Sequence, residues 1–150
     1  MKLVVQVPCL NEEETLGEVL QTIPRTIEGF DSIDVLVIDD GSTDDTIAVA
    51  KAHGVDVIIR HRTTRGLAEA FRSGVDYALT HGADVLVNTD GDNQYPQSDI
   101  PKLVTPILEG SADIVVGDRR TNTISHFSRG KKLLQRVGSA VVNRAAGTQI

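Results

Sequence analysis

Aromatic side chains are scarce in this sequence. Its 150 residues include three Phe, two Tyr and no Trp. The core of the fold must therefore be aliphatic, and few side chains can serve as the stacking platforms that hold single-stranded nucleic acid. The formal net charge of −6 also argues against a general binder of polyanions. We therefore expect no nucleic-acid partner.

Cysteine and long apolar runs are scarce as well. Cys9 is the single cysteine, so no intramolecular disulfide can form, and a reducing compartment fits. The first ten residues are interrupted by Gln6 and Pro8 and are too short for a signal peptide. No apolar run approaches the roughly 18–20 residues of a membrane span. We expect a cytoplasmic protein, either soluble or bound at the cytoplasmic face of a membrane.

Charge is distributed unevenly along the chain. Residues 1–117 carry 8 Lys/Arg and 20 Asp/Glu, whereas residues 118–150 carry 7 Lys/Arg and one acid, Asp118. A basic end on an acidic domain favours a surface that faces phosphates or anionic lipid. The alternative is a solvated helix face whose partner lies in missing sequence. The first reading predicts peripheral membrane contact through residues 118–150.

Strand and helix patterns alternate along the chain. Apolar runs predict strands at residues 3–7, 35–38, 55–59, 85–89 and 114–116. A helical pattern follows each of them. Asn11, with Glu14, is the expected cap of the first helix, and Ser42 or Thr43 is the expected cap of the second. Alternation of this kind predicts an α/β fold, a doubly wound and mostly parallel sheet with helices on both faces.

Length and pattern predict a single domain over residues 1–150. The pattern at residues 148–150 predicts the start of an apolar strand, so we expect a domain that is truncated on its C-terminal side. A sheet cut there would leave an unpaired edge, which would favour association into a homo-oligomer.

Three of the predicted strands end in polar clusters. Residues 8–13 follow the first strand, residues 39–42 the second and residues 90–94 the fourth. Each cluster by itself could be a helix cap or a solvated turn. Because the carboxyl ends of parallel strands share one edge, the three can converge there on one acidic pocket. Asp90 and Asp92, separated by one glycine, are hard oxygen ligands suited to a divalent cation and its diphosphate.

These segments resemble the nucleotide-binding half of a family 2 glycosyltransferase with the GT-A fold. The resemblance rests on residues 7–13 (VPCLNEE), 37–44 (VIDDGSTD) and 89–92 (TDGD). Residues 65–68 resemble the loop before the third helix of that family, with Thr64 where Asn is usual. Residues 93–96 (NQYP) and 117–119 (GDR) resemble the polyprenyl-phosphate subgroup, which includes dolichol-phosphate mannose synthases, although Gly91 replaces its common Ala.

The resemblance implies a metal-dependent inverting glycosyltransferase that uses a UDP- or GDP-linked sugar and Mg²⁺ or Mn²⁺. Within the implied nucleotide site, Asp40 would hold the base and Asp90 would contact the ribose or the metal-bound diphosphate. The residues implied to bind the nucleotide are Pro8, Asn11, Glu12, Asp39, Asp40, Arg65 and Asp90.

For the metal and the reaction, the resemblance implies a second set of roles. Asp92 would ligate the cation, with Asp90 and Gln94 as further ligands. Arg119 would meet the phosphate of donor or acceptor and act with Asp92 in catalysis, and Lys131 aligns loosely with a similar role. An attacking hydroxyl would need a general base, whereas a lipid phosphate is already an oxyanion. No convincing base follows Asp118, so the acceptor is expected to be a polyprenyl phosphate unless the base lies beyond Ile150.

Three alternatives compete with an active transferase. A donor-binding module without catalysis would share the fold and part of the site. A receiver-like phosphoacceptor domain would place its acids after the first and third strands, and an Asp-x-Asp phosphatase would place them after the first. Neither arrangement matches this chain.

Two kinds of residue are expected to be structural. The four histidines, at positions 53, 61, 81 and 126, lack metal-ligand spacing and are expected at the surface or in helix caps. Cys9 is expected to be a small buried apolar side chain beside the pocket.

Overall fold

The computed structural model describes residues 1–117, and residues 1–115 form one compact unit. The elements alternate in the predicted order. They are β1 (Lys2–Cys9), α1 (Leu16–Thr22), β2 (Ser32–Asp39), α2 (Thr46–Ala52), β3 (Val57–Arg60), α3 (Leu67–Thr80), β4 (Val85–Asn88), a 3₁₀ turn η1 (Gln97–Asp99) and α4 (Ile100–Leu108). Among the described residues, no helix is both long and apolar enough to cross a bilayer.

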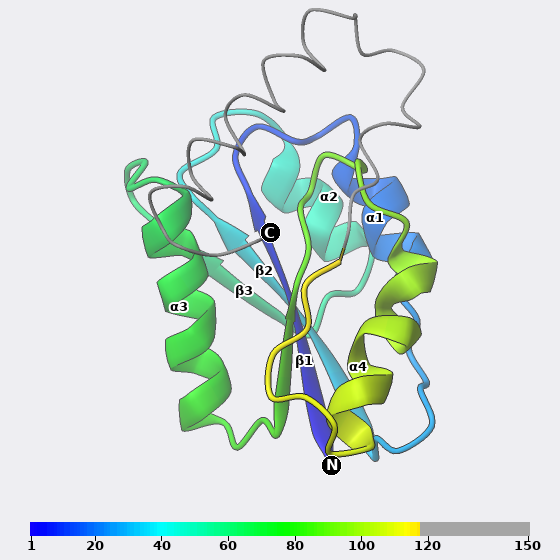
Figure 1. The fold of residues 1–150 in the computed structure, drawn as a ribbon. Coiled ribbons are helices and arrows are strands. Elements are labelled where there is room, and N and C mark those ends of the chain that lie inside the picture. The colour runs from blue at the N-terminus through cyan, green and yellow to red at the C-terminus, as the bar shows by residue number, and fades with distance from the viewer. Residues whose placement is uncertain (118–150) are drawn as a thin grey trace, which may run out of the picture. The chain divides into compact units, whose positions relative to one another are not determined.

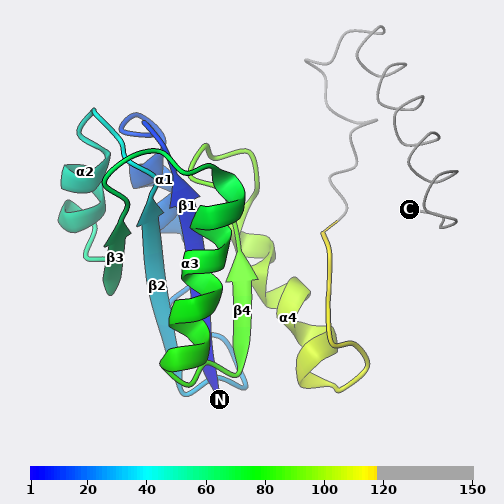
Figure 2. The same ribbon diagram turned by 90° about the vertical axis from the view of Figure 1, so that its left-hand side faces the viewer.

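The four strands form one parallel sheet in the order β3-β2-β1-β4 (Figure 2). The register pairs Val5 of β1 with Val35 of β2 and with Val87 of β4. Each parallel pair needs a crossover connection, which the helices provide. All four carboxyl ends therefore lie at one edge of the sheet, as the sequence predicted.

Helices cover both faces of the sheet (Figure 1). Helix α3 packs on one face, over a cluster that includes Val4, Leu36 and Ala70. Helices α1, α2 and α4 cover the other face, over a larger aliphatic cluster that includes Val5 and Val37. This arrangement confirms the predicted doubly wound α/β fold.

The first two helices begin later than the sequence predicted. Helix α1 begins at Leu16 after Thr15, and α2 begins at Thr46 after Asp45. The predicted cap Asn11 instead has a φ of 57° and accepts a hydrogen bond from the Thr43 backbone N–H. The Asn11 and Ser42 side chains do not cap the helices that follow them, because they form hydrogen bonds between the loops that follow β1 and β2.

The predicted strand at residues 114–116 is also absent. This segment has no ladder partner among the described residues, and Ile114 and Val116 are 82% and 86% exposed. A strand forms only where a neighbouring strand accepts and donates its backbone hydrogen bonds. The apolar run alone could not show whether a partner strand lies beside it. The final helical pattern, near residues 133–141, lies outside the described residues.

A buried amide joins α3 to the sheet. Gln6 of β1 is fully buried, and its side-chain N–H donates to the Asn88 side-chain oxygen over 2.8 Å. Helix α3 passes directly above it at Gly74, where a Cβ atom would lie 1.7 Å from Gln6 Oε1 and 3.2 Å from Ile38 Cδ1. Glycine at position 74 therefore lets the helix approach close enough to seal this face of the core.

We expect Gly74→Ala to destabilise the protein by about 1–2 kcal/mol. Alanine alone would favour the helix by about 0.5–1 kcal/mol, but overpacking against Gln6 costs about 1–3 kcal/mol. Urea unfolding of the variant measures the difference. In the Gln6→Ala background the contact with Gln6 is gone and only the 3.2 Å approach to Ile38 Cδ1 is left, so the cost of Gly74→Ala should fall. An unchanged cost in that background would contradict this packing.

Candidate active site

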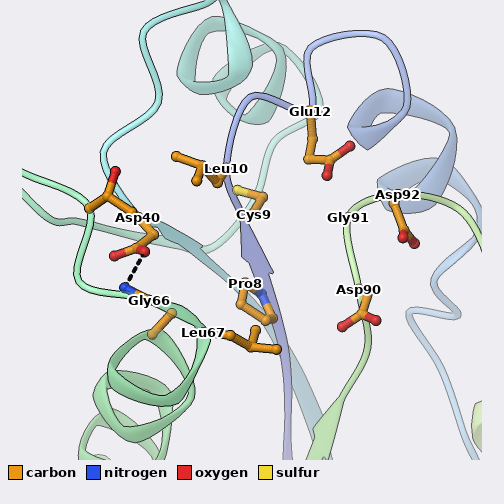
Figure 3. Close-up of a pocket in the computed structure, with 12 residues that line it drawn as sticks. Pro8, Cys9, Leu10, Glu12, Asp40, Gly66, Leu67, Asp90, Gly91 and Asp92 are labelled. Atoms are coloured by element: carbon orange, nitrogen blue, oxygen red, sulfur yellow. Dashed lines mark hydrogen bonds between the residues drawn. The ribbon is translucent and has the colours of Figure 1, made fainter.

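A cavity of about 260 Å³ opens at the carboxyl edge of the sheet (Figure 3). Figure 3 shows Asp40 on one side of it, Asp90 and Asp92 on the other, and Pro8 and Leu67 between them. The lining contains four carboxylates and, among the described residues, no Lys or Arg. Its members are Pro8, Cys9, Leu10, Glu12, Asp40, Thr64, Gly66, Leu67, Ala70, Asp90, Gly91 and Asp92.

The Asp40 carboxylate lies at one side of this cavity, with the loop after β3 held against it. Its Oδ1 accepts hydrogen bonds from His61 Nδ1 at 2.6 Å and the Arg65 N–H at 2.9 Å, and its Oδ2 accepts the Gly66 N–H at 2.7 Å. Burial by itself would raise the pKa of Asp40, but these hydrogen bonds outweigh it and lower the pKa below 3.8. Asp40 is therefore a carboxylate at neutral pH and orders residues 61–66.

His61 is buried, so the prediction that it lies at the surface or in a helix cap was wrong. It is 5% exposed, and its two ring nitrogens contact Asp40 and the Ser73 hydroxyl. Its place in the sequence could have indicated a role at the site, because His61 directly follows β3 and so lies at the same sheet edge as the three polar clusters. The third strand end therefore contributes a side chain that holds the cavity residue Asp40 without lining the cavity itself.

Asp39 and Asp40 are adjacent, yet they face different surroundings. Asp39 is fully buried, accepts the Ser42 N–H over 2.9 Å and lies 3.1 Å from Arg60 Nε. It does not line the cavity. Asp39 thus shapes the turn after β2, while Asp40 faces the cavity.

Asn11 joins the loops that follow β1 and β2. Its backbone N–H donates to the Ser42 hydroxyl, and its side-chain oxygen accepts the Thr43 N–H, each over 2.9 Å. Its neighbour Glu12 donates a backbone N–H to the Thr46 hydroxyl. Asn11 lies beside the cavity without lining it, whereas Pro8 and Glu12 line it.

The loop that carries Asp90 and Asp92 is packed against the end of β1. The Thr15 hydroxyl lies 2.9 Å from Glu12 Oε2 and 2.8 Å from the Gly91 carbonyl oxygen, where it can donate. A Cβ atom at position 91 would lie 3.1 Å from the Cys9 Cβ, so glycine fits this contact. Cys9 is buried as predicted, and burial raises the pKa of its thiol to about 12, so it is no nucleophile.

Asp90 and Asp92 suit a divalent cation that brings further ligands with it. Both line the cavity and both are half-buried. Among the described residues, no cluster of three or more His, Cys, Asp or Glu side chains could enclose a metal ion. Two carboxylates at an open cavity match the sites where Mg²⁺ is completed by phosphate oxygens and water. The donor set therefore fits a cation shared with a diphosphate.

The remaining predicted residues lie around the cavity or beyond the described region. Arg65 is exposed and contributes its backbone N–H to Asp40. The Gln94 side chain is exposed and does not line the cavity, although its backbone N–H donates to Asp92 over 3.1 Å. Arg119 and Lys131 lie outside the described residues. Their roles remain predictions.

The family model for glycosyl transferase family 2 matches residues 4–146. The chain therefore belongs to glycosyltransferase family 2. Among curated proteins, the chain is 32% identical over 149 residues to an undecaprenyl-phosphate mannosyltransferase of Micrococcus luteus, covering 93% of this chain and 58% of that protein. It is 29% identical to a UDP-N-acetylglucosamine–dolichyl-phosphate N-acetylglucosaminyltransferase of Methanococcus voltae, covering 77% of this chain and 51% of that protein.

A solved structure shares the fold. Glucosyl-3-phosphoglycerate synthase of Mycobacterium tuberculosis, crystallised with Mn²⁺, UDP and glucosyl-3-phosphoglycerate, superposes with a TM-score of 0.57 at 28% identity. The match covers 71% of this chain and 39% of that one. The fold is therefore the GT-A type. The chain spans a little over half the length of the curated relatives it matches.

We expect Asp40→Asn to destabilise the protein by about 2–3 kcal/mol at pH 7, because an amide nitrogen cannot accept the N–H groups that the carboxylate binds. The folded-state pKa of Asp40 is lowered, so its contribution is present above the unfolded pKa of about 3.9 and is lost as pH falls through the folded value.

Urea unfolding from pH 7 down to pH 3 checks this expectation. The stability difference between the original protein and Asp40→Asn should narrow below about pH 4. A difference that stayed constant over this range would show that the Asp40 charge contributes nothing.

Proposed function

We propose that this chain forms the donor half of a metal-dependent, inverting glycosyltransferase that takes a sugar from a UDP- or GDP-linked donor. The observation that carries the proposal is the charge of the cavity. Four carboxylates line it without a Lys or Arg among the described residues, so a diphosphate can enter only with a cation that offsets the repulsion. The structural relative crystallised with UDP and Mn²⁺ supports this reading.

The two sides of the cavity suggest how the donor lies. The base would contact Asp40, and the ribose would lie near Pro8 and Glu12. The diphosphate would lie at the opposite side, where Asp90 and Asp92 would hold a Mg²⁺ or Mn²⁺ ion. Asn11 and Asp39 would act by shaping the loops, and Arg65 and Gln94 would contact the donor from the rim.

The reaction needs charge compensation at the leaving group. The anomeric carbon–oxygen bond breaks with its electron pair leaving on the nucleoside diphosphate, and the acceptor oxygen bonds to the anomeric carbon from the opposite face. A bound divalent ion would neutralise charge that develops on the departing phosphate. Asp92 would orient the diphosphate, and Arg119 would meet the phosphate of donor or acceptor.

A polyprenyl phosphate is the acceptor we propose. Relatives from Micrococcus luteus and Methanococcus voltae are named for transfer to undecaprenyl and dolichyl phosphate. A phosphate oxyanion needs no general base, which agrees with the lack of a convincing base after Asp118. Residues 118–150, with 7 Lys/Arg and one acid, would hold the protein at the cytoplasmic face of the membrane.

A donor-binding module without catalysis is the second candidate. It is favoured by the described cavity, which accounts for donor and metal binding, the two properties that such a module would share with an active transferase. The receiver-like alternative is disfavoured, because such a domain would place an acid after its third strand. Among the described residues that line the cavity, the acids follow β1, β2 and β4, and none follows β3.

We expect the chain to bind UDP or GDP in the presence of Mn²⁺ and to bind the same nucleotide at least 10-fold more weakly without it. Asp92→Asn should remove the metal-dependent part, because one of the two carboxylates that ligate the ion is lost. Isothermal titration calorimetry with each nucleotide, with and without Mn²⁺, measures both effects.

Asp76→Asn is the matched control. This carboxylate is 67% exposed on α3 and lies outside the cavity, so the same change of charge should leave binding unaltered. If neither nucleotide bound to the original protein with Mn²⁺, or if Asp92→Asn bound as tightly as the original, the proposed donor site would be wrong.

A sugar-transfer assay distinguishes an active glycosyltransferase from a donor-binding module without catalysis. With the nucleotide identified, we expect the chain to form a polyprenyl-phosphate sugar from the matching nucleotide sugar and a short polyprenyl phosphate. Chromatography of radiolabelled product measures the transfer. Nucleotide binding without any transfer or donor hydrolysis would favour the binding module.

A further inference from the structure

A continuous chain of two hydrogen bonds joins the side chains of Asp40, His61 and Ser73. Asp40 follows β2, His61 follows β3, and Ser73 lies in α3. Asp40 Oδ1 is 2.6 Å from His61 Nδ1, and His61 Nε2 is 2.9 Å from Ser73 Oγ. His61 is 5% exposed and Asp40 is 4% exposed, so the hydrogen bond between them is shielded from water. Shielding makes this hydrogen bond stronger than an exposed one.

The direction of the first hydrogen bond is fixed by chemistry. An ionised carboxylate only accepts, so His61 Nδ1 carries a hydrogen and donates whether the ring is neutral or charged. Ser73 adapts at the far end, since its hydroxyl also lies 2.9 Å from the Glu69 carbonyl oxygen and can donate to either partner. Ser73 therefore holds the ring in place, while His61 holds the carboxylate.

The donors around Asp40 also determine which part of it remains available. Among the described residues, Oδ1 accepts from His61 and the Arg65 N–H, and Oδ2 accepts from the Gly66 N–H. A carboxylate offers about four lone-pair sites, so Oδ1 is filled and Oδ2 retains one. Figure 3 shows the Asp40 carboxylate at the cavity and bonded to Gly66.

We propose that His61 is a positioning residue for base recognition: it anchors Asp40 Oδ1, so that Oδ2 faces the cavity and accepts an N–H of the nucleotide base. The inference rests on the proposed donor site and deepens it. It predicts that His61 contributes to binding of the base and not to binding of the metal and diphosphate, which lie at the other side of the cavity.

Two substitutions distinguish the loss of the hydrogen bond to Asp40 from the general effect of replacing His61 by another polar side chain. In His61→Asn the amide nitrogen stands where Nδ1 stood and can still donate to Asp40. In His61→Gln the amide nitrogen stands where Nε2 stood, towards Ser73. Asp40 then loses its side-chain donor and keeps the Arg65 and Gly66 N–H groups. His53→Gln is the control, because His53 lies in the cap of α2 and contacts Val49 and Gln21.

Calorimetry with Mn²⁺ should compare two ligands, the nucleoside diphosphate that the original protein binds and inorganic pyrophosphate. We expect His61→Gln to weaken nucleotide binding about 10-fold or more, the usual effect of losing a hydrogen bond to a charged group. Pyrophosphate binding should stay within twofold. His61→Asn and His53→Gln should bind both ligands nearly as the original does.

Three outcomes would overturn the inference. Nucleotide binding that is unchanged in His61→Gln would show that the anchor is unnecessary. An equal loss for nucleotide and pyrophosphate would show a general structural role. A loss in His61→Asn as large as that in His61→Gln would show that the Nδ1 donor is irrelevant. Failure of the proposed donor site is distinct, since the original protein itself would then bind neither UDP nor GDP, and the inference would fall with it.

Discussion

The buried carboxylate of Asp40 is the constraint on which the loop after β3 and its side of the cavity depend. A charged group that is 4% exposed is costly unless donors surround it, and here they come from a ring nitrogen and two backbone N–H groups. Those donors all belong to residues 61–66, so satisfying one charge fixes a whole loop. Gly41 completes the fit, because a Cβ atom there would lie 2.9 Å from the Thr64 nitrogen.

Similar links hold the other loops of this edge. Asn11 spans the loops after β1 and β2, and Thr15 lies between Glu12 and the Gly91 carbonyl. Each link joins a side chain to a neighbouring loop, so the four strand ends behave as one connected rim. Loops held in this way are positioned before any ligand arrives, which lowers the entropy lost on binding.

The sequence predicted the sheet well because its signal is local: apolar runs that end in acids mark buried strands and the edge where they stop. Helix starts were predicted less well. Asn11 and Ser42 are residue types that commonly cap helices, but here their side chains form hydrogen bonds to another loop. The strand expected near Ile114 depended on a partner strand that pattern cannot supply. His61 was missed for the same reason, because its burial follows from Asp40 and Ser73, which are distant in sequence.

Charge along the cavity suggests why a nucleoside diphosphate would lie in one direction. At Asp40 the negative charge is compensated by three donors from the loop after β3, which leaves an acceptor suited to an uncharged base. At the other side, Glu12, Asp90 and Asp92 bring three carboxylates to the lining. A cation would gain most there, and a diphosphate would bind beside the cation rather than beside Asp40. Because each ligand then favours the other, metal affinity and nucleotide affinity must rise by the same factor when both are present.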